Sequence, residues 1–185
     1  MQIKNRKKII IICLISLFLF NFNLNAEEFD ISAKEVAIDQ KNEILTGTGS
    51  VVAKSSDGKI IYADKITYKK VKEFLLAEGN VKISDIDGNT FTTDKATYDK
   101  INEQIITYNK TSVRLKEGYE LVSKNILYDM TKEILNSNEK STFIDIDGNI
   151  IESSMFNYDI KNNLFSSIGK IKIVDINKNK YFFKE

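Results

Sequence analysis

Apolar and polar residues alternate along most of the chain after its first 28 residues. Between Leu75 and Ile83 the odd positions are apolar or small, and the even positions from Glu78 to Lys82 are polar. A period of two predicts a strand with one buried face. Between Ile61 and Tyr68 the apolar positions change parity near Asp64. A phase slip of one residue predicts a bend or bulge within an otherwise continuous arm.

This alternating pattern recurs every 30 residues. Aligned columns run through the sequence: Tyr68, Tyr98, Tyr128 and Tyr158; Leu45, Leu75, Ile105, Leu135 and Phe165; and Ala53, Ile83, Val113, Phe143 and Ile173. A further column holds Gly49, Gly79 and Gly169, with Asn109 and Glu139 in the other copies. A weaker first copy begins at Ile31. We therefore predict five stacked 30-residue units, none of which can bury its apolar face alone.

Each unit is expected to contain two long, bent arms joined by turns. One turn falls at residues 70–73 and its equivalents. The other falls at an acidic-Gly pair, namely Asp57-Gly58, Asp87-Gly88, Glu117-Gly118 and Asp147-Gly148. Asp-Gly provides the positive φ angles of a tight hairpin, so the arms should be antiparallel. Because Val, Ile, Thr, Tyr and Phe are abundant, the predicted fold class is all-β, a repetitive, open-ended antiparallel jellyroll.

The N-terminus is predicted to be a secretory signal peptide over residues 1–26, followed by a single β domain over 27–185. Basic residues from Lys4 to Lys8 precede an apolar run from Ile9 to Phe20, and a small residue, Ala26, precedes the expected cleavage point. An uncleaved anchor is the alternative, although the run is shorter than the about 20 residues of a membrane span. Lipidation at Cys13 is not expected, because Ile12 before it is not small.

Composition narrows the function classes. Removing the signal takes four of the 27 basic residues and none of the 26 acidic ones, which leaves a net charge of −3 and argues against nucleic acid as a partner. The chain has no histidine, so Ser-His-Asp catalysis and His-ligated metals are excluded. Asp85-Ile-Asp87-Gly-Asn89 resembles the start of a calcium loop, but a recurring hairpin turn is the favoured interpretation. We expect no enzyme, no cofactor and no metal site.

Several segments together resemble the OstA-like family. The matching segments are Ile61-Tyr-Ala-Asp-Lys-Ile-Thr-Tyr68, Leu76-Ala-Glu-Gly-Asn-Val-Lys-Ile83, Phe91 to Tyr98, and Leu45-Thr-Gly-Thr-Gly-Ser-Val-Val52. Later copies depart from this pattern, since Ser123-Lys124 and Ser153-Ser154 replace Ala-Asp. The family includes the periplasmic lipopolysaccharide-transport bridge protein and the N-terminal periplasmic domain of the outer-membrane lipopolysaccharide-assembly protein.

The resemblance implies a periplasmic, possibly outer-membrane-associated, jellyroll that shields the acyl chains of lipid A. Its implied partners are lipopolysaccharide, neighbouring jellyroll domains joined by edge-strand pairing, and further copies of itself joined head to tail. The nominated lipid-binding residues are Ile66, Tyr68, Val81, Ile83, Ala96, Tyr98, Val113 and Tyr128. The chain ends just inside a sixth copy, which fits a bridge protein and the N-terminal part of the assembly protein equally well.

Two alternatives remain open at this stage. The even repeat also suits a structural β-repeat scaffold, or an adhesin-like envelope protein, without lipid cargo. The tyrosine column is expected to pack as an aromatic ladder inside the core, and its second interpretation is the lining of a lipid groove.

Overall fold

The structure is a computed structural model that describes residues 29–184, so the predicted signal peptide lies outside the described residues. This part of the chain is built from strands, with one short 3-10 turn, η1 (Lys70–Lys72). The strands are β1 (Phe29–Ser32), β2 (Glu35–Asp39), β3 (Ile44–Ser55), β4 (Ile60–Lys69), β5 (Phe74–Ser84), β6 (Thr90–Asp99), β7 (Gln104–Tyr108), β8 (Lys110–Arg114), β9 (Glu120–Lys124), β10 (Leu127–Asp129), β11 (Ile134–Ser137), β12 (Ser141–Ile144), β13 (Ile150–Asp159), β14 (Leu164–Val174) and β15 (Lys180–Phe183). Between residues 29 and 184, no helix is long and apolar enough to cross a membrane.

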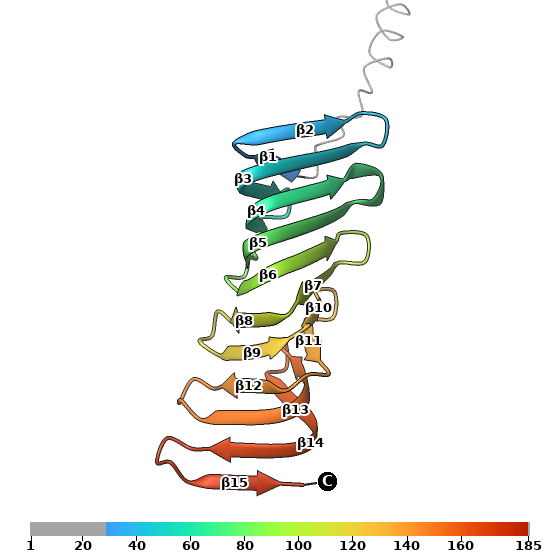
Figure 1. The fold of residues 1–185 in the computed structure, drawn as a ribbon. Coiled ribbons are helices and arrows are strands. Elements are labelled where there is room, and N and C mark those ends of the chain that lie inside the picture. Colours follow the sequence, from blue (N-terminus) through green and yellow to red (C-terminus); the bar gives the residue numbers. More distant parts are fainter. Residues whose placement is uncertain (1–28, 185) are drawn as a thin grey trace, which may run out of the picture.

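The strands follow one another along the long axis of the molecule, from β1 and β2 at one end to β15 at the other (Figure 1). Neighbouring arms pair antiparallel throughout, as in β3 with β4 and β4 with β5. This confirms the predicted all-β class and the antiparallel arms. It excludes parallel coils for the described strands, because a solenoid of that kind would pair its arms in the same direction.

Each arm bends in its middle, so the strands form two half-sheets. Half-sheet A contains β2, β7, β10 and β11, and half-sheet B contains β1, β8, β9, β12 and β15. The long strands β3, β4, β5, β6, β13 and β14 contribute one part to each half-sheet, because their pairing register shifts at the bend, as between Tyr62 and Lys65. The slip predicted near Asp64 is therefore confirmed.

Glycines of the predicted column make the bend possible. Gly79 has a φ of +77° and the following Asn80 has a φ of +48°, a backbone that opposes two residues to one on the neighbouring strand. A Cβ atom on Gly79 would overlap the carboxylate of Asp64. Glycine is needed here both for its backbone freedom and for the close approach of the neighbouring side chain.

The acidic-Gly pairs form hairpin turns as predicted, but the positive φ is confined to the glycine. In the first, the amide of Gly58 donates to the Ser55 carbonyl and the amide of Ser55 donates to the Lys59 carbonyl, so three residues form the loop. Only Gly58 has a positive φ, +89°. This is a type I turn closed by a glycine in the left-handed region, which is the next most common hairpin.

Candidate lipid-binding interior

Two of the sequence columns merge into one side-chain row in each half-sheet. In half-sheet A the paired positions alternate between tyrosines and aliphatic residues. The row runs through Leu45, Tyr68, Leu75, Tyr98, Ile105, Tyr128, Leu135, Tyr158 and Phe165. In half-sheet B it runs through Ile31, Ala53, Ile61, Ile83, Phe91, Val113, Leu121, Phe143, Ile151, Ile173 and Tyr181. Each row spans nearly the whole length of the molecule.

The two rows pack against each other. The ring of Phe91 in half-sheet B stacks on Tyr128 of half-sheet A with 5.4 Å between centroids. Phe143 of half-sheet B lies 5.2 Å from Tyr158 with the two rings tilted by 47°, and Phe29 of β1 meets Tyr68 edge to face at 5.0 Å. The interior between the half-sheets is therefore a filled apolar core along the described strands that these contacts join.

All eight residues nominated as lipid-binding lie in this core. Tyr68 is the most exposed of them, at 6%. The others are 5% exposed or less: Ile66, Val81, Ile83, Ala96, Tyr98, Val113 and Tyr128. Half-sheet A provides Ile66, Tyr68, Ala96, Tyr98 and Tyr128, and half-sheet B provides Val81, Ile83 and Val113. The structure brings them together around one interior, and their contact with lipid stays a prediction.

The tyrosine column is buried, but the tyrosines do not form a ladder of adjacent rings. Tyr98 pairs with Leu75 on one side and Ile105 on the other. The expectation of a ladder was wrong in this detail, because the 30-residue period skips every second arm. Burial raises the pKa of Tyr158 to about 12, with the nearby Tyr119 contributing. The Tyr158 hydroxyl is therefore uncharged near neutral pH.

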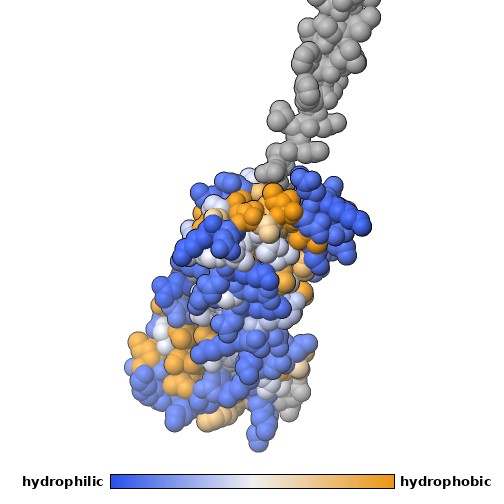
Figure 2. Space-filling model, turned by 45° about the horizontal axis from the view of Figure 1, so that its top comes forward, coloured by the Kyte–Doolittle hydropathy of each residue, from blue (hydrophilic) through white to orange (hydrophobic). Residues whose placement is uncertain are grey.

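The core opens at the β1–β2 end. A hollow of about 270 Å³ lies there between the two half-sheets, lined by the core residues Phe29 and Tyr68, by the partly buried Leu45 and by Ile38 of β2. Ile38 is 66% exposed because β2 has no further strand beside it within the described chain. Apolar side chains gather at this end (Figure 2).

Polar contacts close the long side of the interior, where turns of the two half-sheets meet. Asp57 pairs with Lys59 and lies 3.6 Å from the ammonium nitrogen of Lys100. Lys59 also reaches Glu103 at 4.0 Å. Burial alone would raise the pKa of Asp57, but hydrogen bonds from Lys59 and Ser55 outweigh it and hold that pKa well below its usual range. Farther along, the Asn163 amide donates to the Tyr119 hydroxyl at 2.7 Å.

Hydroxyl groups fill the inner side of the bend in the middle of the molecule. Thr111 is fully buried, and its hydroxyl is within hydrogen-bonding distance of the hydroxyls of Thr107 at 2.8 Å and Thr93 at 3.2 Å. The hydroxyls of Ser123 and Ser141 lie 2.8 Å apart. Sequence reasoning missed this polar stretch. The departure of the later copies from the Ala-Asp pattern was the feature of the sequence that could have indicated it. Three arms are interrupted at this bend, where each is divided into two short strands: β7–β8, β9–β10 and β11–β12.

The other end of the molecule leaves apolar side chains uncovered. Phe182 and Phe183 of β15 are 68% and 51% exposed, and Ile168 of β14 is 60% exposed. Within the described chain β15 pairs only with β14. Its outer edge therefore presents unpaired backbone groups beside an apolar surface.

The acidic residues of the calcium-like segments serve the turns. The Asp85 carboxylate accepts hydrogen bonds from the backbone amide and the side-chain amide of Asn89, both at 2.8 Å. Asp145 and Asn149 repeat this arrangement. Across residues 29–184, no group of three or more acidic, histidine or cysteine side chains could hold a metal ion.

Comparison with known proteins gives only distant likenesses. No family model matches the chain, and no curated protein matches it. Among solved structures, LptH, described as the LptA-homologous periplasmic component of the lipopolysaccharide transport device of Pseudomonas aeruginosa, is 12% identical with a TM-score of 0.32, over 85% of this chain and 94% of that one. The wild-type TCP10 domain of Danio rerio CPAP is 10% identical with a TM-score of 0.16, over 82% and 100%. Scores this low do not establish a shared fold or function.

Proposed function

We propose that this protein carries lipopolysaccharide through the periplasm and shelters its acyl chains between the two half-sheets. The observation that supports this most directly is the pair of apolar rows that face each other along the molecule and open at the β1–β2 end. The resemblance of the repeats to the OstA-like family points the same way.

The energetics of such a carrier follow from the apolar rows. Each methylene moved out of water is worth about 0.8 kcal/mol, so a free acyl chain is very unfavourable in an aqueous compartment. The two rows of aliphatic and aromatic side chains can remove this cost without chemistry. The protein is thus proposed to be a carrier and not an enzyme.

Loading requires the half-sheets to move apart, because side chains fill the space between them. The β1–β2 hollow gives a starting point, since Phe29, Leu45 and Tyr68 are already in contact with it. Acyl chains could then displace ring contacts such as Phe91 with Tyr128. The polar contacts around Asp57 would open along the side of the molecule.

The two ends of the molecule suit joining to neighbours. β15 has a free edge, and β2 pairs only with β3 within the described chain. An added strand could extend the sheet at either end by backbone hydrogen bonds. The proposed neighbours are jellyroll domains of the transport machinery or further copies of this chain. Such joining fits a bridge protein and the N-terminal domain of an outer-membrane assembly protein alike.

A photo-crosslinking experiment tests the lipid cargo. A photoreactive phenylalanine replaces Tyr68, which lines the hollow, or Tyr62, which lies on the same strand but is 43% exposed. The exported protein is irradiated in a lipopolysaccharide-producing bacterium, and adducts are probed for lipopolysaccharide. We expect adducts at position 68 and none at position 62. Equal labelling at both positions would show that the adducts come from surface contact.

The filled interior also favours a second candidate, a structural β-repeat scaffold without cargo. Ring contacts such as Phe91 with Tyr128 give the core the packing of an ordinary domain. This candidate predicts no lipid adduct at Tyr68 or at Tyr98. The same crosslinking experiment therefore decides between the two functions.

A further inference from the structure

A row of lysines crosses the outer face of half-sheet B at the bend. Lys110 of β8 pairs directly with Lys124 of β9. On the following strands the row lies next to a series of paired residues of the inner face: Ser141 pairs with Ser153, Ser153 with Ile171, and Ile171 with Phe183. Lys140 precedes Ser141 and Lys170 precedes Ile171, whereas Ser154 follows Ser153 and Lys184 follows Phe183. The residues of the row are Lys110, Lys124, Lys140, Ser154, Lys170 and Lys184. This set is called the lysine row below.

The lysines of this row are close together and form no ion pair within residues 29–184, although Lys140 lies near Glu152, whose pKa is lowered by a hydrogen bond from Lys172 and by the charges of Lys172 and Lys140. Neighbouring strands are about 4.8 Å apart, so the row spans about 24 Å. All five lysines are exposed. No carboxylate among residues 29–184 forms an ion pair with any of them, whereas Lys172 beside the row pairs with Glu152 at 2.8 Å. Like charges at this spacing repel, because it is shorter than the screening length of about 8 Å at physiological salt.

The positive charge is a local property of this half of the molecule. At the same place on the bend, the earlier strands carry Asp64, Asn80 and Asp94. Asp64 accepts a hydrogen bond from the Asn80 amide at 2.8 Å. The change of sign coincides with the departure from the Ala-Asp pattern at Ser123-Lys124. The fold itself does not require lysine here, since the earlier arms bend with acidic residues.

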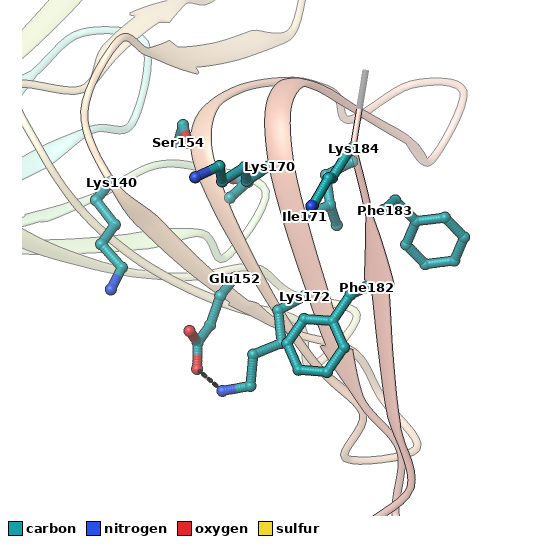
Figure 3. A pocket seen from close by; sticks show the side chains of 10 residues that line it. Lys140, Glu152, Ser154, Lys170, Ile171, Lys172, Phe182, Phe183 and Lys184 are labelled. Atoms are coloured by element: carbon teal, nitrogen blue, oxygen red, sulfur yellow. Dashed lines mark hydrogen bonds and ion pairs between the residues drawn. The ribbon is translucent and has the colours of Figure 1, made fainter.

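A groove accompanies the C-terminal part of the row. It has a volume of about 440 Å³ and is lined by Lys140, Lys170 and Lys184, with the aromatic ring of Phe182 at its side. Figure 3 shows these lysines and Ser154 on neighbouring strands, with Phe182 next to the Glu152–Lys172 pair. A volume of this size suits a small ligand group.

We propose that the lysine row binds an acidic oligosaccharide, one with phosphate or carboxylate groups on neighbouring sugars. Lysine binds phosphate as a point charge, and these lysines, one strand apart except where Ser154 separates Lys140 from Lys170, can meet a series of anionic groups on neighbouring sugars. The Ser154 hydroxyl can donate to a sugar oxygen, and the ring of Phe182 can cover the apolar face of a sugar. The groove favours a ligand of this size over the flat surface of a membrane.

The inference rests on surface charge and extends the proposed function, because the saccharide part of a lipopolysaccharide is a ligand of this class. Acyl chains would occupy the interior, and the acidic sugars would follow the outside of half-sheet B. The two parts of the proposal use different residues, so each can fail without the other.

The test measures the affinity of the full exported chain for a deacylated, phosphorylated core oligosaccharide by fluorescence anisotropy. The variant is Lys140→Gln/Lys170→Gln/Lys184→Gln. The control, Lys41→Gln/Lys54→Gln/Lys72→Gln, removes the same charge from exposed sites outside the row. We expect about tenfold weaker binding for the variant, from three contacts of modest energy, and at most about a twofold change for the control. Treating the oligosaccharide with phosphatase should weaken binding to the unmodified protein.

Three outcomes overturn the proposal. Equal losses in the variant and the control would indicate general attraction to net charge. Unchanged binding in the variant would remove the row from the site. If the unmodified protein binds phosphatidylglycerol vesicles through these lysines but not the oligosaccharide, the row faces a membrane. A fluorescent acyl probe is measured in parallel: oligosaccharide binding without acyl binding would support the lysine row and contradict the proposed lipid carriage.

Discussion

Replacing Phe91 by alanine tests whether the interior is a filled core or a standing lipid groove. Phe91 is fully buried, pairs with Ile83 and Val113, and stacks on Tyr128. Truncating a buried phenylalanine costs about 3–5 kcal/mol of unfolding free energy, from lost transfer energy and the cavity left behind. The lost ring contact accounts for about 0.5–1.5 kcal/mol of the interaction. We therefore expect Phe91→Ala to lower the unfolding free energy by about 3–5 kcal/mol.

The matched control is Phe182→Ala, the same chemical change at a side chain that is 68% exposed. It should change the unfolding free energy by no more than about 0.5 kcal/mol. Urea unfolding followed by circular dichroism measures both, with the slope of the transition checked for each variant. A cost for Phe91→Ala as small as that for Phe182→Ala would refute the packed interior and would indicate that the half-sheets stand apart in solution.

Three further predictions concern the bends, the buried hydroxyls and the acidic turn. Gly79→Ala should destabilise the protein by at least about 1 kcal/mol more than Gly148→Ala. Both glycines have a positive φ, but only at Gly79 would the added methyl group overlap a neighbouring side chain; thermal unfolding measures the difference. Thr111→Val should cost about 1–3 kcal/mol, because it breaks two buried hydrogen bonds, whereas Ser153→Ala removes a hydroxyl without a partner in the described structure and should be close to neutral. Equal costs for these two variants would contradict the hydroxyl network. Since the pKa of Asp57 is lower in the folded state than its value of about 3.9 in the unfolded state, its contribution to stability is present above about pH 4 and is lost as the pH falls below it. The stability deficit of Asp57→Asn should therefore be largest at about pH 7 and clearly smaller at about pH 2, where part of the contribution is already lost; Asp147→Asn, at the equivalent position of a later turn, is the matched control.

The pattern of residues was enough to predict how each arm folds. Alternation identified the strands, and the parity change near Asp64 located the bend. The glycine column was visible as well, but its role in the bend came from the structure, where Gly79 has a left-handed backbone. The alternation and the parity change depend on residues close in sequence, which is why they could be read without a structure.

The nominated lipid-binding residues show where this reasoning reached its limit. Parity placed Ile83 and Tyr98 on buried faces, and both are buried. It could not show that Phe91 of one half-sheet would stack on Tyr128 of the other and fill the space between them. Whether an apolar face is a core or a groove depends on the distance between the half-sheets, and only the tertiary structure determines that distance.

The lysine row shows the same limit. Lys110, Lys140 and Lys170 lie 30 residues apart, and Lys124, Ser154 and Lys184 form a second column with the same period, but the period does not show that the two columns lie side by side. They become neighbours because successive arms run in opposite directions and meet at the bend. The sequence by itself determined the arms, their bends and the face that each arm buries. Pairing between arms decided which side chains from distant positions share one surface, because register and half-sheet packing are properties of the assembled sheet.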